Sequence, residues 1–198
     1  MERFTTLHDI RRQAWNLLFR ATVERNAAMR TPVLATTDQR GIPRVRTVVL
    51  RKADTDGRLL YYFTDIRSEK ISELHYQPQS SVLFWDPKRH LQIRCTGNMV
   101  IHQQDDLSGE FWQQLSKPGR KAYATRLDPG TPLPAYTDGL PDNWSELDLS
   151  ETDKYQENFA LLVHQVEDMD VLHLEREGHQ RARFEWENDQ WQSTWLVP

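Results

Sequence analysis

The feature that most constrains the fold is a series of short runs rich in β-branched and aromatic residues, separated by turn-forming residues. Runs of this kind are typical of strands. In the first half of the chain they are Pro32–Thr37, Arg44–Leu50, Leu59–Phe63, Ser81–Trp85 and Leu91–Ile101. The segments Asp38–Gly41 and Asp54–Gly57 have the composition of hairpin turns. Parallel strands would need crossover helices, so the spacing predicts an antiparallel barrel or sandwich, of which we favour the barrel.

Helical patterns flank these strands. Apolar residues recur at three- and four-residue steps from Leu7 to Asn26, which predicts an amphipathic helix. Shorter helices are expected after Ser68, over Asp105–Leu115 and around Thr152–Asn158. Further strands are expected at Phe159–Val166, Val171–Leu174, Arg181–Trp186 and Trp191–Val197. Prolines and glycines recur without periodicity after Lys117, so a loop-rich surface excursion is predicted at about 117–158.

Composition limits the class of protein. The 198 residues suit one domain, 1–198, and 38% of them are hydrophobic, without an apolar run near the roughly 20 residues of a membrane span. The first nine residues lack the pattern of a secretory signal, so we expect a soluble cytoplasmic protein. A net charge of −4 predicts neither nucleic acid nor an anionic membrane as a partner. The single cysteine, Cys95, favours a buried strand residue, and no metal site is predicted.

Two groups of basic residues could form an anion site. Arg44, Arg46 and Arg51 lie on one predicted strand or at its end. The segment 67–70 lies where the short helix is expected to begin, with Ser68 directly before the helix. A helix N-terminus, a hydroxyl and basic side chains together suit a phosphate group. The alternative is that the strand arginines are solvated and Ser68 only caps the helix. Caps are far commoner than anion sites, so spacing alone favours the alternative.

Several common catalytic classes lack their patterns. No Gly-x-Gly-x-x-Gly or Walker sequence occurs, which argues against a dinucleotide fold or a P-loop enzyme. The seven histidines are dispersed, and no Ser, His and Asp constellation stands out. Hydrolase and metalloenzyme functions are therefore disfavoured.

A set of motifs carries a resemblance to a known family. They are Pro32-Val-Leu-Ala-Thr36, Gly41-x-Pro43, Arg46-Thr-Val-Val-Leu50-Arg51, Tyr62-Phe-Thr64-Asp65, Arg67-Ser68-x-Lys70, Gln92-Ile-Arg-x-x-Gly97, Arg183-Phe184, Glu187-Asn188-Asp189-x-Trp191 and Leu196-Val197-Pro198. In order and spacing they resemble the FMN-binding split barrel of the pyridoxamine 5′-phosphate oxidase superfamily, over nearly all of the chain except Lys117–Asn158. The resemblance implies a mainly β split barrel with flanking helices, FMN as cofactor, and a homodimer with the flavin at its interface.

The resemblance also implies roles for individual residues. Arg46 and Lys70 would hold the FMN phosphate beside Ser68, and Arg67 would replace a cation that the family has after the serine. The other residues implied in cofactor binding are Thr47, Val48, Val49, Arg51, Phe63, Thr64 and Gln92, with Arg183 contributed by the second subunit. For Phe63, Thr64 and Gln92 the residues alone would favour ordinary strand packing or an exposed position.

The substrate side departs from the family pattern. The order of Arg and His is exchanged at His179 and Arg181, the flavin-covering tryptophan falls near Leu172, and a Gln-Ser pair has no counterpart. The resemblance implies His179 and Arg181 as catalytic residues, with Arg51 and Lys117 as substrate contacts. It predicts an oxidoreductase of an uncharacterised branch that passes a hydride from a small substrate to FMN. The alternatives are an NAD(P)H-dependent flavin reductase-like enzyme and a non-enzymatic flavin carrier or sensor.

Overall fold

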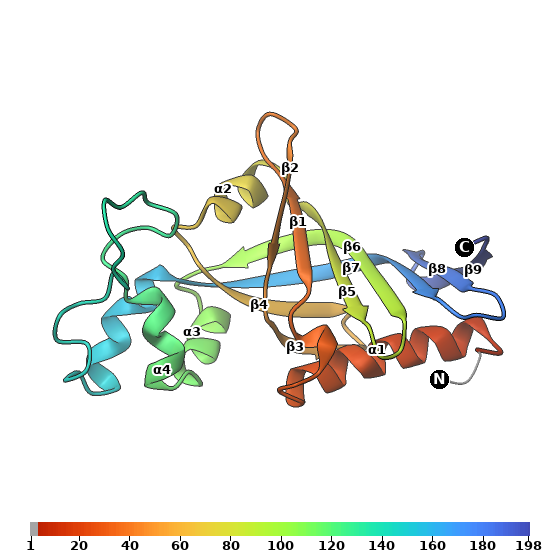
Figure 1. Cartoon of the computed structure of the whole chain (residues 1–198), viewed down its shortest axis with the longest axis horizontal. Helices are drawn as coiled ribbons and strands as arrows, with labels where there is room; N and C mark the ends of the chain where they lie inside the picture. Colours follow the sequence, from red (N-terminus) through yellow and green to blue (C-terminus); the bar gives the residue numbers. More distant parts are fainter. Residues whose placement is uncertain (1–3) are drawn as a thin grey trace.

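A computed structural model of the chain describes residues 4–198, in which one large antiparallel sheet is flanked by helices (Figure 1). The strands are β1 (Val33–Thr37), β2 (Pro43–Thr47), β3 (Leu50–Asp54), β4 (Leu59–Asp65), β5 (Gln79–Asp86), β6 (Leu91–His102), β7 (Phe159–His173), β8 (Gln180–Glu187) and β9 (Gln190–Leu196). The α-helices are α1 (Leu7–Val23), α2 (Glu69–Tyr76), α3 (Asp106–Gln113) and α4 (Lys117–Arg120). Three 3₁₀ helices are η1 (Ala28–Arg30), η2 (Lys121–Tyr123) and η3 (Ser150–Asn158).

The sheet follows the path β2-β1-β5-β6-β7-β4-β3, and β8 and β9 extend from β7. Strand β7 organises this arrangement because β6 pairs with it along nearly its whole length. Its first half also pairs with β4, and its second half pairs with β8. The two ends of the path, β2 and β3, do not pair with each other within residues 4–198, so the sheet is an open, split barrel. The predicted antiparallel β class is confirmed.

Two apolar clusters hold the sheet and its helices together. The first contains the inward-facing residues of the sheet and the buried face of α1, whose members are Ile10, Ala14, Trp15, Leu18 and Ala21. Cys95 lies fully buried in this cluster, as predicted, and burial raises the pKa of its thiol. The second cluster joins β4 and β7 to α3 and η2 through the buried residues Tyr61, Trp112, Tyr123, Phe159, Leu161 and Val163. Each large apolar side chain buried in this way contributes about 1.5–3 kcal/mol.

The excursion at 117–158 is docked onto the second cluster rather than free. Its anchor is Arg120, which is 1% exposed and lies over the ring of Trp112 at 4.5 Å. The Arg120 guanidinium donates to the carbonyl of Leu149 at 2.9 Å and to Asp153 at 2.7 Å. This single side chain therefore ties the start of the excursion to its end.

Three predicted strands have the wrong boundaries. The run Arg44–Leu50 is divided between β2 and β3, because the chain leaves its partner β1 and joins β4; at the break, the N–H of Val48 donates to the carbonyl of Pro32 at 2.9 Å. The runs predicted at Phe159–Val166 and Val171–Leu174 form one strand, β7. The polar residues between them continue the pairing with β6 through a register shift, so the break in hydrophobicity is no break in the strand.

The register shift depends on Gly97. A Cβ at this position would overlap the backbone carbonyl oxygen of Gln165, which has no room to move in the paired strand. We expect Gly97→Ala to lower the free energy of unfolding by about 3 kcal/mol, at the upper end of overpacking effects. Thermal unfolding should then begin several degrees lower. The control is Gly109→Ala in α3, where the nearest atom is 3.7 Å away and alanine favours the helix; equal melting temperatures for the two variants would contradict the argument.

No helix within the described part of the chain is long and apolar enough to cross a membrane.

Candidate functional site

A polar cradle lies where β4 ends and α2 begins. The ammonium of Lys70 donates to the hydroxyls of Thr64 at 3.0 Å and Ser68 at 2.9 Å. Ser68 occupies the N-cap position of α2, but its hydroxyl makes no cap bond with the helix and instead donates to the carbonyl of Asp65 at 2.6 Å. The Ser68 oxygen therefore accepts from Lys70, and the side chain does not act as a simple helix cap.

The ammonium of Lys70 is bound by hydroxyl groups. Among residues 4–198 no carboxylate forms an ion pair with its ammonium, although the side chain is partly buried. Burial lowers the pKa of Lys70, and the nearby guanidinium of Arg46 lowers it further. A lysine at a helix N-terminus with no ion pair among the described residues suits an anion such as a phosphate, whereas Arg46 is already paired with Glu73.

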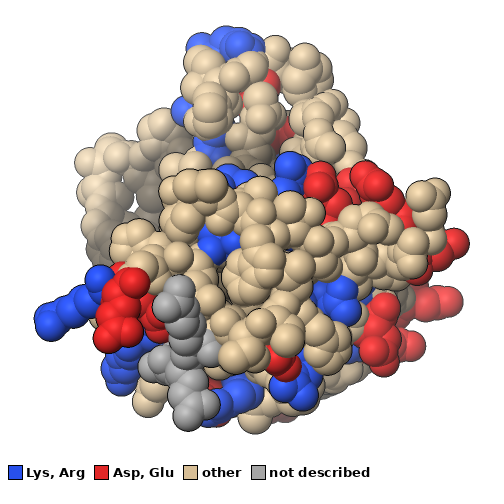
Figure 2. All heavy atoms as spheres, turned by 90° about the vertical axis from the view of Figure 1, so that its right-hand side faces the viewer, with Lys and Arg blue, Asp and Glu red and all other residues tan. Residues whose placement is uncertain are grey.

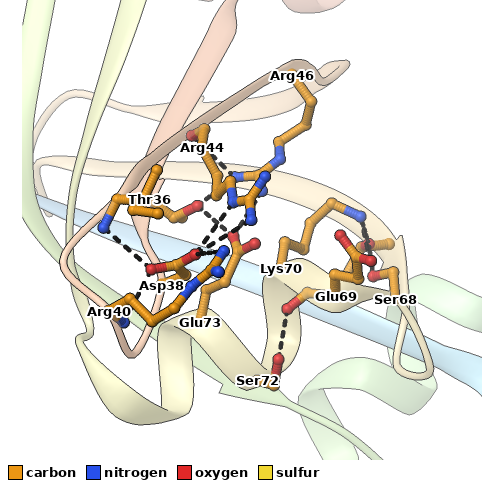
Figure 3. Close-up of polar contacts among 12 residues, drawn as sticks. Thr36, Asp38, Arg40, Arg44, Arg46, Ser68, Glu69, Lys70, Ser72 and Glu73 are labelled. Carbon is orange, nitrogen blue, oxygen red and sulfur yellow. Dashed lines mark hydrogen bonds and ion pairs between the residues drawn. The ribbon is translucent and has the colours of Figure 1, made fainter. Parts of the chain in front are cut away.

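Arg46 is held toward this cradle from the opposite side. Figure 3 shows its guanidinium turned toward Thr36 and Glu73, while Lys70 extends toward Ser68. Arg46 donates to Glu73 at 2.5 Å, and Thr36 donates to the same carboxylate oxygen. The Glu73 side chain is buried on α2, so the ion pair fixes the position of Arg46 relative to the helix.

The other residues implied in cofactor binding on this side lie on β3 and β4 and on the link between β2 and β3. Val48 is buried, Val49 is half-buried and Thr47 is exposed at the link between β2 and β3. The guanidinium of Arg51 lies over the ring of Phe63 at 5.0 Å. Phe63 in turn packs edge-on against Phe159, which fixes its ring in the second apolar cluster.

Arg67 is occupied by contacts within the chain. Its guanidinium makes a two-pronged pair with Asp65, at 2.9 and 2.6 Å, and donates to the carbonyl and hydroxyl of Thr125 at 3.0 Å each. Hydrogen bonding to Asp65 raises the pKa of Arg67. In this arrangement Arg67 joins the cradle to the excursion. Its predicted contact with FMN would require some of these bonds to be exchanged.

A second cluster lies on the outer face of β6, β7 and β8. Its members, called here the β6–β8 cluster, are Gln92, Arg94, Asp168, Asp170, Arg181 and Arg183. Their strand neighbours Ile93 and Ala182 face the core, so the alternation of strand residues turns the cluster outward. Arg183 pairs with Asp168 at 2.5 Å, and Arg181 pairs with Asp170 at 2.8 Å. Three residues predicted to contact the flavin or substrate are thus brought together.

The cradle and the β6–β8 cluster lie at opposite ends of β7. Thr64 is opposite Ala160, whereas Arg181 is opposite Leu172. Twelve residues of extended strand separate the two positions by on the order of 35 Å. Figure 1 shows the same separation, with α2 at the upper left and β8 at the right. One small ligand therefore cannot touch both groups within a single chain.

Two predicted residues lie apart from both groups. The ammonium of Lys117 donates to the carbonyls of Ser145 and Leu147 inside the excursion. His179 lies in the loop before β8, where its Nδ1 accepts the N–H of Glu175 at 3.0 Å. It borders a cavity of about 740 Å³ whose lining residues include Lys88, Arg89, His90 and His173. The substrate contact of Lys117 and the catalytic role of His179 stay predictions.

Figure 2 shows the face that carries the right-hand end of Figure 1, with its basic and acidic side chains in separate small groups. No continuous basic surface covers this face.

Sequence reasoning missed four residues of the site, which are Thr36, Glu73, Arg94 and Asp170. Glu73 and Asp170 are both 5% exposed or less. The available signal was a carboxylate at a position of a helix or strand where the pattern predicts burial. Such groups are rarely buried unless they are paired, so the signal predicts a basic partner.

Part of the sequence is similar to a known protein family. Residues 12–103 match the family described as pyridoxamine 5′-phosphate oxidase, FMN-binding domain. A pyridoxine/pyridoxamine 5′-phosphate oxidase of Chromohalobacter salexigens is 41% identical over 66 residues, 33% of this chain and 30% of its own. The corresponding enzyme of Deinococcus deserti is 34% identical over 92 residues, 46% of this chain and 42% of its own. The matches thus span less than half of these relatives.

Solved structures extend the likeness of the fold to the whole chain. A pyridoxamine 5′-phosphate oxidase-related, FMN-binding protein of Nostoc punctiforme has a TM-score of 0.77 at 23% identity, and the match covers 100% of both chains. PhzG of Burkholderia lata has a TM-score of 0.74 at 18% identity, covering 100% of this chain and 98% of its own. Residues 12–103 therefore match the FMN-binding domain of the pyridoxamine 5′-phosphate oxidase family, whose cofactor is FMN, and the whole chain has the fold of an FMN-binding split barrel.

Proposed function

We propose that the chain is an FMN-dependent oxidoreductase that acts as a homodimer on a small substrate. The observation that carries this proposal is Lys70 at the start of α2, with Arg46 of β2 held on the same helix by Glu73. Lys70 is partly buried and forms no ion pair with any carboxylate in the described part of the chain, and two hydroxyls already orient its ammonium. These residues fit the phosphate of FMN by charge and by donor number.

The distance along β7 supports the proposed homodimer. Gln92, Arg181 and Arg183 are implied in binding or chemistry, yet they lie on the order of 35 Å from the cradle of the same chain. A flavin in the cradle of one chain would reach the β6–β8 cluster only if a second copy supplies it. The outward direction of that cluster supports such an arrangement.

In this arrangement each group has a defined task. FMN, when bound, supplies the capacity to accept a hydride from the substrate. Lys70 and Arg46 hold its phosphate, Arg51 and Phe63 border the site, and the β6–β8 cluster of the partner orients the substrate. The excursion, docked through Arg120, packs Tyr123 into the apolar cluster that Phe63 borders.

Two other functions use the same cofactor. An NAD(P)H-dependent flavin reductase-like enzyme would take its hydride from nicotinamide, and a carrier or sensor would bind FMN without turnover. The test begins with the absorption spectrum of the purified protein, where flavin bands are expected. Oxygen consumption is then measured with candidate substrates, with and without NAD(P)H. Consumption without NAD(P)H supports the oxidase, consumption only with it supports the reductase, and none supports the carrier.

We expect poor turnover of pyridoxine and pyridoxamine 5′-phosphates. The structure places Arg181 on the outer face of β8 and His179 in the preceding loop, so the exchanged pair presents different groups to a bound ring. A displacement of about 1 Å can reduce a rate on the order of a hundredfold. The measurement compares the native protein with the His179→Arg, Arg181→His variant. Native turnover of about 1 s⁻¹ or more would contradict the expectation, since that is within the range of ordinary enzymes.

FMN binding should weaken at alkaline pH. Burial and Arg46 lower the pKa of Lys70 below its ordinary value of 10.5, so the free protein loses this proton earlier than an exposed lysine. A phosphate prefers the charged form, so affinity is full below the lowered pKa and falls as pH rises through it. Titrations of FMN against pH measure this effect. In Lys70→Arg the side chain stays charged, so the decline should be smaller; identical pH profiles would rule out Lys70 as the titrating group.

A further inference from the structure

Asp170 is a buried carboxylate between two partly exposed arginines. Its side chain is 3% exposed, whereas those of Arg181 and Arg94 are 32% and 43% exposed. Arg181 donates from Nε to Oδ1 at 3.1 Å and from Nη2 to Oδ2 at 2.8 Å. Arg94 donates from Nη2 to the same Oδ2 at 3.0 Å. One carboxylate therefore fixes two guanidiniums that belong to different strands.

The contact with Arg181 is specific in direction. Two parallel N–H bonds from Nε and Nη2 fix both the plane of the guanidinium and its rotation, which a single bond would not do. The remaining Nη1 edge is turned away from Asp170. Arg181 can therefore donate to a ligand from Nη1 without breaking its contact with the carboxylate.

Asp170 does not bond to the arginine directly opposite it in the sheet. In the strand register Asp170 is directly opposite Arg183, yet Arg183 pairs with Asp168 at 2.5 Å and with Glu185 at 2.9 Å. Asp170 instead bonds diagonally to Arg181, two residues along β8. Each aspartate of β7 thus holds a different arginine of β8.

The burial of Asp170 is costly for stability alone. A carboxylate that loses water is compensated by its partners only in good geometry, and an exposed arginine gains little from such a pair. We propose that Asp170 is a positioning residue, which holds Arg181 and Arg94 in the orientation that receives the substrate at the flavin site of the partner chain. This inference rests on the proposed function, since it assigns Arg181 to the substrate side of the dimeric site.

A double-mutant cycle on the FMN-loaded protein tests this coupling. The variants are Asp170→Asn, Arg181→Gln and the combination, and the probe is pyridoxal 5′-phosphate, whose binding is followed by the change in flavin absorption. We expect Asp170→Asn to weaken binding about tenfold or more, and to have little further effect once Arg181 is Gln. Additive losses in the cycle would overturn the proposal, because they would show that Asp170 does not act through Arg181.

The control is Asp86→Asn. Asp86 is also a buried aspartate paired with an arginine, Arg89, at 2.7 Å, but it lies on β5 outside the proposed site. It should lower the melting temperature without changing the affinity for the probe. Equal weakening of probe binding in Asp86→Asn and Asp170→Asn would assign the effect to general destabilisation.

A second measurement needs no substrate. In the FMN-loaded protein, the ¹⁵N–¹H signal of Arg181 Nε, identified by its absence in Arg181→Lys, should be protected from solvent exchange. Asp170→Asn should remove this protection, and an unchanged signal would overturn the positioning role. If the native protein holds FMN and shows the protected signal but does not bind the probe, the substrate class fails while the role of Asp170 stands.

Discussion

The double variant Arg46→Ala, Lys70→Ala is expected to lose FMN on dialysis. Each of these side chains would make charge-assisted hydrogen bonds to the phosphate, and each such bond contributes about 1.5–3 kcal/mol. Together they amount to about 3–6 kcal/mol, so the dissociation constant should rise about 10² to 10⁴-fold. Equilibrium titration of the apo-protein with FMN measures the change. Full flavin occupancy after dialysis would rule out the cradle as the phosphate site.

The structure also dictates the controls for this experiment. Removal of Arg46 leaves Glu73 buried without its partner, which by itself costs about 3–5 kcal/mol of stability. The series is therefore repeated with Glu73→Gln, which removes the buried charge and leaves Arg46 available to the phosphate. Lys52→Ala is the surface control. Lys52 is on β3, outside the cradle, and its ammonium lies over the ring of Tyr61. Both Glu73→Gln alone and Lys52→Ala should retain FMN.

Much of the fold could be predicted from the sequence because its elements have local signals. Short runs of β-branched residues with Asp-rich and Gly-rich turns predict antiparallel strands, and α1 has a regular apolar face. The points at which strands end were harder to predict. Whether Arg44–Leu50 is one strand or two depends on which neighbours each half pairs with, and β1 and β4 are distant in sequence. Local pattern carries no information about that choice.

The same contrast applies to the candidate site. Ser68 and Lys70 are two residues apart at the start of a helix, so their meeting could be predicted from local structure. The link between Arg46 and Glu73 could not, because it joins β2 to α2 across 27 positions. The pairing of Arg94 with Asp170 depends on the register between β6 and β7, which only the complete sheet determines. Long-range pairs of this kind account for all four residues that the sequence analysis missed.

Mixed dimers should recover flavin sites that neither parent retains. One parent carries Arg46→Ala and Lys70→Ala in the cradle, and the other carries Arg181→Gln and Arg183→Gln in the β6–β8 cluster. If each flavin is held by the cradle of one chain and the cluster of the other, each parent has two damaged sites. A mixed dimer has one site with both halves intact and one with neither. This arrangement follows from the separation of the two groups along β7.

The expected result is quantitative. Refolding an equal mixture gives about half mixed dimers, so about a quarter of all flavin sites should regain native affinity and activity. Either parent refolded alone should bind almost no FMN tightly. Any tightly bound FMN in the mixture therefore measures the recovered sites. The stoichiometry of tightly bound FMN, read from flavin absorbance after gel filtration, is the measurement, and light scattering confirms that the recovered fraction has twice the chain mass. If both groups instead served a flavin within one chain, mixing would restore nothing.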